Sequence, residues 1–194
     1  MPTWLLARHG RTEWNVEGRR QGRLDSPLTP DGHRDAERIA TLAAGRAVDR
    51  VLSSPLGRAH ATAVIVGDRI GVGVTMLDDL AELDHGDLSG LTDAEIETRF
   101  PGVLAQRTRD KYRWRFPGGE SYADAAGRAA QAIEQIGDRS RRPLVVAHEM
   151  IARMLMMHLL RLEPAAALEW RLPHGELVEL DVARGSAHGP LEGA

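Results

Sequence analysis

The stretch that decides the fold is Leu5-Leu6-Ala7-Arg8-His9-Gly10-Arg11-Thr12-Glu13-Trp14-Asn15. Its first part belongs to an apolar run from Trp4 to Ala7, which predicts a short buried strand. The run stops abruptly at Arg8-His9-Gly10, and this change predicts a tight turn after the strand. Because ligands bind outside the carboxyl ends of strands in an open α/β sheet, the turn is a candidate binding site.

The side chains at this turn suit an anion. The guanidinium of Arg8 presents a planar fork of donors that matches a phosphate group, and an imidazole such as that of His9 can take a covalent intermediate. A second interpretation needs no function: a histidine with satisfied hydrogen bonds at a strand end, beside an arginine on a solvated face. The rest of the chain has to distinguish the two.

The composition predicts a single globular domain spanning residues 1–194, with a glycine-rich, flexible tail from about residue 183. The net charge of −3 indicates no general attraction to nucleic acid or membranes. The chain has no cysteine, which excludes disulfides and cysteine nucleophiles. We see no signal peptide and no apolar run of membrane-spanning length, so we expect a cytoplasmic enzyme. The oligomeric state is left open, with a homodimer as one option.

Strands and helices are predicted to alternate along the chain. Strands are expected at 4–7, 50–54, 72–77 and 143–148, with an edge strand at 175–182. Helices are expected from the caps Thr29 and Ser121 to about 45 and 137, at 58–70, 107–114 and 150–160, and after a capping box at 92–95. This alternation predicts a three-layer α/β fold, in which a mostly parallel sheet has helices on both faces.

Three of the predicted strands end in residues that suit one site. The first ends at Arg8 and His9, the second is followed by Arg58 on the first turn of a helix, and the fourth ends at His148. The carboxyl ends of parallel strands lie on one edge, so two arginines, two histidines and a helix N-terminus should converge there. Four such residues at one edge are hard to explain by packing.

Phosphoryl transfer is the chemistry that these residues suit. It asks a protein mainly for positioning and for positive charge around the phosphoryl oxygens. Arg8, Arg58 and His148 would supply that charge, while His9 would attack phosphorus. Glu82 and Asp84 lie in an acidic loop at the same edge, and a carboxylic acid there could protonate the leaving group. Nearby cations lower the pKa of such an acid and burial raises it, so the sequence alone leaves the net direction open.

Several segments carry a resemblance to a known family. They are Arg8-His9-Gly10 with Thr12 and Asn15; Leu28-Thr29 with Gly32; Ser53-Ser54-Pro55-Leu56 with Arg58; Leu80-Ala81-Glu82 with Gly86 and Gly90; Pro117-Gly118-Gly119-Glu120-Ser121; and Val145-Val146-Ala147-His148. In this order they resemble the histidine phosphatase superfamily, the phosphoglycerate-mutase-like family, from Leu5 to about Leu162.

The resemblance implies a role for each matching position. His9 would be the phosphorylated nucleophile, and Glu82, four residues before Gly86, the general acid. The phosphoryl group would be held by Arg8, Arg58, His148, Thr12 and Asn15, and the substrate side would be formed by Gln21 and Gly22. No cofactor and no metal are implied.

One residue departs from the family pattern. Glycine usually follows the second histidine, whereas this chain has Glu149. A carboxylate beside a phosphate pocket is repulsive unless it points away or pairs with a cation, for which Arg153 is a candidate. Whether Asp84 or His85 contributes to the site is also left open.

We therefore expect a metal-independent phosphomonoesterase that acts on a small phosphorylated metabolite. A cofactor-dependent phosphoglycerate mutase is the first alternative, because it would use the same phosphohistidine. Such mutases typically carry a lysine after the acidic loop, whereas here that stretch is Gly90-Leu91-Thr92-Asp93 and the only lysine is Lys111. The second alternative is a non-catalytic protein that binds anions or nucleic acid with the surface of residues 8–23.

Overall fold

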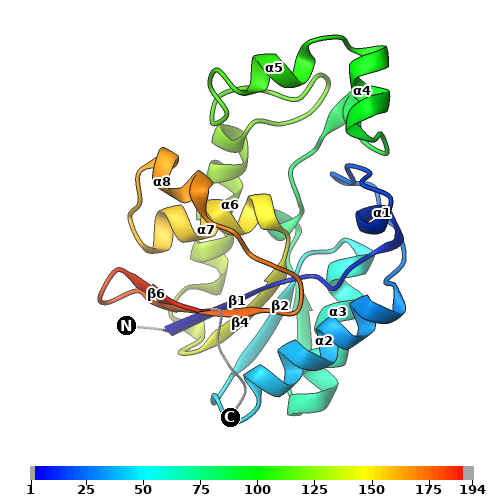
Figure 1. The fold of residues 1–194 in the computed structure, drawn as a ribbon. Coiled ribbons are helices and arrows are strands. Elements are labelled where there is room, and N and C mark those ends of the chain that lie inside the picture. The colour runs from blue at the N-terminus through cyan, green and yellow to red at the C-terminus, as the bar shows by residue number, and fades with distance from the viewer. Residues whose placement is uncertain (1–2, 190–194) are drawn as a thin grey trace.

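The computed structural model describes residues 3–189, apart from the side chain of Asp138. Six strands form one sheet in the order β3-β2-β4-β1-β5-β6. The parallel strands are β1 (Thr3–Arg8), β2 (Arg50–Ser53), β3 (Val74–Met76) and β4 (Pro143–Ala147), and the antiparallel ones are β5 (Leu177–Asp181) and β6 (Ser186–His188). The predicted α/β fold with a mostly parallel sheet is confirmed (Figure 1).

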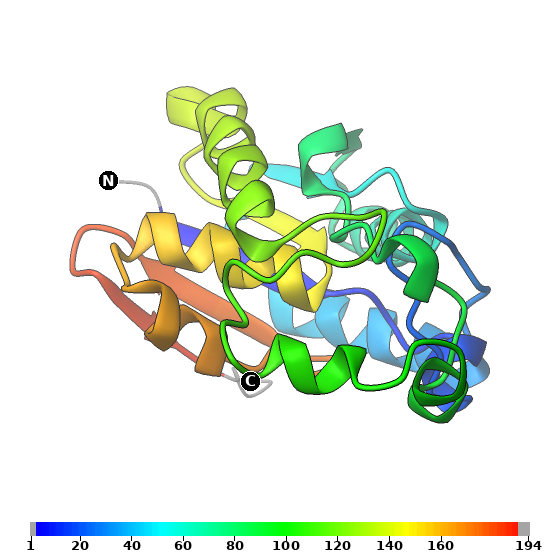
Figure 2. The ribbon, with the colours of Figure 1, turned by 90° about the horizontal axis from the view of Figure 1, so that it is seen from above.

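Helices cover both faces of this sheet (Figures 1 and 2). The helices α2 (Pro30–Ala43) and α3 (Gly57–Ile70) lie on one face, and α6 (Tyr122–Ile136) and α7 (Glu149–Leu159) on the other. Leu5 of β1 belongs to the core under α2, whereas the next residue, Leu6, belongs to the core under α7. Burial on both faces explains why β1 is continuously apolar.

The helix caps predicted at Thr29, Thr92 and Ser121 are confirmed. Thr29 caps α2 with Pro30 in the first helical position. Capping boxes begin both α4 (Asp93–Arg99), at Thr92, and α6, at Ser121. In each case the side-chain hydroxyl accepts a backbone N–H that has no partner within the helix.

Two short helices were not predicted, and one predicted helix is wrong. The unpredicted ones are α1 (Glu13–Val16) and α8 (Pro164–Glu169). The helical region expected at 107–114 is instead α5 (Val103–Arg107) followed by turns. Residues 108–110 are exposed and present no apolar face, and the Asp110 carboxylate accepts the backbone N–H of Arg113, which favours a turn over a further helical turn.

The C-terminal strands also differ from expectation. β5 pairs with β1 on one side and β6 on the other, so it is not an edge strand, and β6 was not predicted at all. Of the tail expected to be flexible from about 183, residues 186–188 form β6, and residues 190–194 lie outside the described residues. Within residues 3–189, no helix is long and apolar enough to cross a membrane.

Two loops meet above the carboxyl ends of the strands. The N–H of Arg20 donates to the carbonyl of Leu91 (3.0 Å), and the N–H of Gly90 donates to the carbonyl of Arg20 (2.7 Å). These bonds place the loop after α1 beside the segment that leads to α4, as both views show (Figures 1 and 2). The edge of the sheet predicted to hold the site is therefore covered.

Candidate active site

Three strand ends meet at one small pocket. The N–H of His9 donates to the carbonyl of Ala147 (3.0 Å), and that of Ser54 donates to the carbonyl of Val146 (3.1 Å). These bonds bring the ends of β1, β2 and β4 together, and the ring centroids of His9 and His148 lie 5.1 Å apart. A pocket of about 150 Å³ opens there, lined by Arg8, His9, Asn15, Arg19, Arg20, Gln21, Gly22, Arg58, Glu82, His85, Glu149 and Met150.

The buried imidazole of His9 has a defined tautomer. Its Nδ1 lies 2.7 Å from the carbonyl oxygen of Gly10, which can only accept, so Nδ1 carries the proton and Nε2 keeps its lone pair. Burial, followed by the charges of Arg58 and Arg8, holds the pKa of His9 well below its usual range. His9 is therefore a neutral imidazole with one nitrogen free to act as a nucleophile.

A second histidine, His174, supports the backbone of the first. Its Nδ1 donates to the carbonyl oxygen of His9 (2.6 Å), and the two ring centroids lie 5.2 Å apart. Burial, together with the charge of Arg8, lowers the pKa of His174 to about 4. No signal in the sequence points to a role for His174, because its position depends on how the chain returns before β5.

Arg58 is fixed by backbone carbonyls. One terminal nitrogen, Nη1, donates to the carbonyl of Leu24 (2.7 Å) and to the Asp25 carboxylate (3.1 Å), and Nη2 donates to the carbonyl of Gly22 (2.9 Å). Its buried Nε has no partner among the residues that the structure describes. A buried N–H without a partner is costly, so this Nε is a donor suited to an anionic oxygen.

Arg8 is arranged in a similar way, but its partner was not predicted. Its Nη1 donates to the carboxylate of Glu149 at 2.7 Å, and its buried Nε has no partner within residues 3–189. Glu149 also pairs with Arg153 at 2.6 Å, which confirms the pairing expected from their spacing along the helix. Glu149, which stands where the family usually has glycine, therefore lines the pocket and is paired with two arginines.

His148 is fully buried and serves as the N-cap residue of α7. Its Nε2 lies 2.8 Å from the hydroxyl of Ser54, and that hydroxyl already accepts the N–H of Leu56. If the Ser54 hydroxyl donates to Nε2, His148 carries its proton on Nδ1, which is buried and has no partner within residues 3–189. Burial, followed by the charge of Arg58, holds the pKa of His148 well below its usual range, which favours the neutral form of its imidazole.

Glu82 reaches the same pocket from the acidic loop and is only 8% exposed. Its carboxylate accepts the N–H groups of Leu83 (3.0 Å), Met150 (3.2 Å) and Ile151 (3.1 Å), the last two at the start of α7. These bonds and the nearby arginines lower its pKa, but burial outweighs them and the net shift is upward. The pKa shift, whose direction the sequence left open, is thus upward, and an upward shift favours the protonated form that a general acid requires.

The other residues expected to bind the phosphoryl group or the substrate divide into two groups. Asn15, Gln21 and Gly22 line the pocket, whereas Thr12 is fully buried and not part of the lining. Thr12 caps α1 and its hydroxyl accepts from the amide of Gln21 (2.8 Å), so it positions its neighbours.

The two residues whose contribution was left open also separate. His85 lines the pocket, stacked on Phe116 at 4.3 Å, and burial lowers its pKa to about 3. Asp84 lies outside the lining, and its side chain accepts the N–H of Gly86 (2.8 Å). Arg19, Arg20 and Met150 line the pocket too, although no sequence signal distinguished these arginines from the rest of the basic segment.

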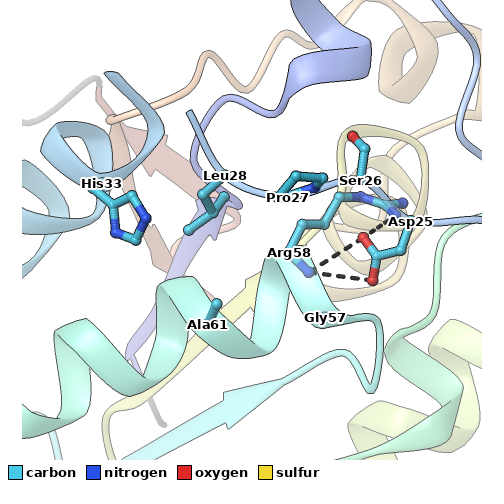
Figure 3. Close-up of a pocket in the computed structure, with 8 residues that line it drawn as sticks. All are labelled: Asp25, Ser26, Pro27, Leu28, His33, Gly57, Arg58 and Ala61. Carbon is cyan, nitrogen blue, oxygen red and sulfur yellow. Dashed lines mark hydrogen bonds and ion pairs between the residues drawn. The ribbon is translucent and has the colours of Figure 1, made fainter. Parts of the chain in front are cut away.

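A larger cavity, of about 470 Å³, shares only Arg58 with this pocket (Figure 3). The other residues that line it are Asp25, Ser26, Pro27, Leu28, His33, Gly57 and Ala61. Neither His9 nor Glu82 reaches this cavity, so its size does not make it the site of chemistry. Within residues 3–189, no three histidine, aspartate or glutamate side chains gather as a metal site would require.

Comparisons with known proteins agree with this geometry. The model of the histidine phosphatase superfamily (branch 1) matches residues 4–189. The "Probable phosphoglycerate mutase GpmB" of Shigella boydii serotype 18 (strain CDC 3083-94 / BS512) is 35% identical over 183 residues, covering 91% of this chain and 83% of that protein.

Two solved structures have the same fold. The mycobacterial glucosyl-3-phosphoglycerate phosphatase in complex with VO3 is 31% identical, with a TM-score of 0.83 and coverage of 93% of this chain and 91% of that one. The alpha-ribazole phosphatase from Shigella flexneri, at 24% identity, shows the fold alone, with a TM-score of 0.85 and coverage of 95% and 93%. The chain belongs to the histidine phosphatase superfamily, in its branch 1.

Proposed function

We propose that the protein is a metal-independent phosphomonoesterase that acts on a small phosphorylated metabolite through a phosphohistidine on His9. The observation that carries the proposal is the free Nε2 of a buried His9 in a pocket that Arg8 and Arg58 also line, each with a buried Nε that has no partner within residues 3–189. Arg8 and Arg58 line the pocket together with His9, and their donors suit the oxygens of a phosphoryl group. His148 is fully buried and does not line the pocket, but its ring lies next to that of His9. The name of the structural relative that is 31% identical, a phosphatase, supports the same activity.

In the first step, Nε2 of His9 forms a bond to phosphorus while the bond between phosphorus and the ester oxygen breaks. Glu82 passes its proton to that oxygen, so the leaving group departs as an alcohol. The raised pKa of Glu82 favours the protonated form that this step needs. Negative charge on the phosphoryl oxygens is met by the Nε donors of Arg8 and Arg58 and by Nδ1 of His148.

In the second step, water replaces the alcohol. The Glu82 carboxylate takes a proton from water, the water oxygen bonds to phosphorus, and the bond between phosphorus and Nε2 breaks. The products are inorganic phosphate, neutral His9 and protonated Glu82, so the enzyme returns to its starting state. The arginines and the histidine supply the charge and the donors, and no step needs a metal.

The experiment that tests this proposal is a trapping measurement. A phosphomonoester with a ³²P label should leave an acid-labile label on His9 after a rapid quench, and p-nitrophenyl phosphate should be hydrolysed in EDTA and inhibited by vanadate. A protein that takes no label and hydrolyses no phosphomonoester would refute the proposal. Activity that disappears in EDTA and returns with one divalent ion would refute metal independence alone.

A phosphoglycerate mutase is the second candidate, because the curated relative carries that name. Both activities begin with the same phosphohistidine, and they differ in whether water or a second substrate group takes the phosphoryl group. With 3-phosphoglycerate and catalytic 2,3-bisphosphoglycerate, we expect negligible 2-phosphoglycerate. Efficient isomerisation with little release of phosphate would make the mutase assignment correct.

A further inference from the structure

Glu149 fills a site made of guanidinium groups on the wall of the pocket. Its Oε2 lies 2.7 Å from Nη1 of Arg8, and its Oε1 lies 2.6 Å from Nη2 of Arg153 and 3.8 Å from Nη1 of Arg171. Glu149 also lines the pocket next to Arg8 and Glu82. A carboxylate of the protein itself thus occupies a position where three arginines converge.

Contacts other than Glu149 hold one of these arginines in place. The buried Arg153 donates from Nε to the carbonyl of Trp170 (2.7 Å) and from Nη1 to the hydroxyl of Tyr122 (2.7 Å). Only its Nη2 is given to Glu149. The guanidinium donors around Glu149 are therefore partly preorganised. They would also bind another anion of the size of a carboxylate if it were placed where the Glu149 carboxylate lies.

Glu149 is the residue that neutralises the positive charge of the arginines around it. Among the residues that the structure describes, no other carboxylate lies within 4.0 Å of the guanidinium nitrogens of Arg8, Arg153 or Arg171. The remaining arginines of the pocket have partners of their own: Arg19 pairs with Glu95, Arg20 with Asp93 and Arg58 with Asp25. Removal of the Glu149 charge would leave Arg8, which lines the pocket, and the neighbouring Arg153 without a carboxylate partner.

We propose that Glu149 is a specificity-determining residue that occupies an anion subsite next to the phosphoryl clamp. The pocket then prefers phosphomonoesters whose leaving group is uncharged and disfavours those that carry a carboxylate or a second phosphate at this position. The inference rests on the proposed function and names its substrate class. It also gives a physical reason for the residue that departs from the family pattern: the carboxylate takes the donors that a second anion would need.

The test compares two probes that differ in one group. Glycerol 3-phosphate and 3-phosphoglycerate share the phosphate and the secondary hydroxyl, but the first has a hydroxymethyl group where the second has a carboxylate. Their inhibition constants against hydrolysis of p-nitrophenyl phosphate are measured for the wild type, for Glu149→Gln and for Glu134→Gln, a control on an exposed position of α6. Calorimetry in a His9→Ala background gives the same ratio of affinities without turnover.

The wild type should bind glycerol 3-phosphate more tightly than 3-phosphoglycerate. Glu149→Gln, which keeps the shape and removes the charge, should shift the ratio toward 3-phosphoglycerate by about tenfold. Glu134→Gln should leave it unchanged. Should Glu149→Gln fail to fold, Glu149→Ala is measured with and without acetate, which should refill the subsite and restore the wild-type preference.

An unchanged ratio in the Gln variant, or no acetate effect in the Ala variant, would overturn the inference. So would a wild type that binds 3-phosphoglycerate as tightly as glycerol 3-phosphate. These outcomes can be distinguished from a failure of the proposed phosphatase activity. A protein that hydrolyses p-nitrophenyl phosphate but shows no shift contradicts only the role of Glu149, and a protein that hydrolyses nothing is still tested for selectivity by calorimetry.

Discussion

The pocket is formed by two parts of the molecule that are held in place in different ways. His9 and His148 stand at the ends of β1 and β4, whose parallel ladder is buried on both faces. Glu82 and His85 come instead from residues 78–120, here called the covering segment. In the described structure this segment contains no β-strand. The proposed nucleophile is thus fixed by backbone pairing, and the proposed acid depends on side-chain contacts.

The covering segment is held in part by a half-buried hub of Arg128 and Glu120. Arg128 of α6 donates to both oxygens of the Glu120 carboxylate (3.0 and 2.9 Å) and, through Nη1, to the carbonyls of Asp79 and Ala81 (2.9 and 3.0 Å). Glu120 in turn accepts the N–H of Asp84 (2.9 Å). These bonds tie down the chain on both sides of Glu82, so the two parts of the pocket can be disturbed separately.

Close packing adds to this restraint at Gly86. Its φ is +50°, in the left-handed region, and a Cβ there would lie 2.0 Å from the carbonyl oxygen of Pro117. The backbone at Gly86 packs so closely against the backbone of residues 117–119 that no residue with a Cβ would fit there. This contact explains why the resemblance to the family includes a glycine four residues after Glu82.

The largest loss of activity should come from a change in the part of the pocket at the strand ends, which holds His9 and His148 and is here called the strand-end part. His9→Ala removes the group that would form the covalent bond, so activity on p-nitrophenyl phosphate should fall by at least about 10⁴-fold. The ³²P label should disappear, and the circular dichroism spectrum should not change. His33→Ala, an exposed position on α2, is the matched control. Substantial activity in the His9 variant would place the nucleophile elsewhere.

The next largest effect should come from the proposed acid. Glu82→Gln keeps the shape but cannot pass a proton, so turnover of an alkyl phosphate should fall by about 10² to 10³-fold. The loss should be smaller for p-nitrophenyl phosphate, whose leaving group needs little protonation. In the wild type, alkyl phosphate turnover should also decline as pH rises through the raised pKa of Glu82, and the variant should lack this decline. Equal losses on both substrates would indicate that Glu82 only positions the substrate.

A smaller effect is expected from the hub that positions this acid. Arg128→Ala removes the bidentate donor of the Glu120 carboxylate and the shared donor of two carbonyls, and we expect a loss of about 1–3 kcal/mol in the free energy of unfolding. The kcat on an alkyl phosphate should fall about tenfold, because a displaced acid transfers protons poorly. Vanadate affinity, which depends on the strand-end part, should be retained. A parallel loss of vanadate affinity would show that the two parts are not independent.

The smallest effect concerns pH and stability. Burial lowers the pKa of His85 to about 3, whereas the unfolded value is about 6.5. Between these values the unfolded chain binds more protons than the folded one, so stability is lost as pH falls below about 6.5. In urea titrations over this range, His85→Phe should reduce the slope of unfolding free energy by about 1.4 kcal/mol per pH unit. An unchanged slope would mean that His85 is protonated in the folded protein.

The same contrast explains what could be predicted from the sequence. The strand-end residues are visible because an apolar run changes abruptly to Arg8-His9, and again to His148, at the end of a strand. The pairing of Glu149 with Arg153 follows from helical spacing, but its pairing with Arg8 depends on the register of β1 with β4. The hub at Arg128 carries no local signal, since one arginine of a helix looks like another until the tertiary structure selects it.

The position of β1 in the sheet has a consequence for the order in which the protein folds. β1 lies between β4 and β5, with Leu5 opposite Leu144 on one side and Glu179 on the other. During synthesis this apolar strand therefore leaves the ribosome before β4 and β5 have been made. It can form its backbone hydrogen bonds only after both of these strands have followed. Pairing between such distant segments is slow, so a ribosome-bound chain that stops short of β5 should contain His9 but be unable to enclose it.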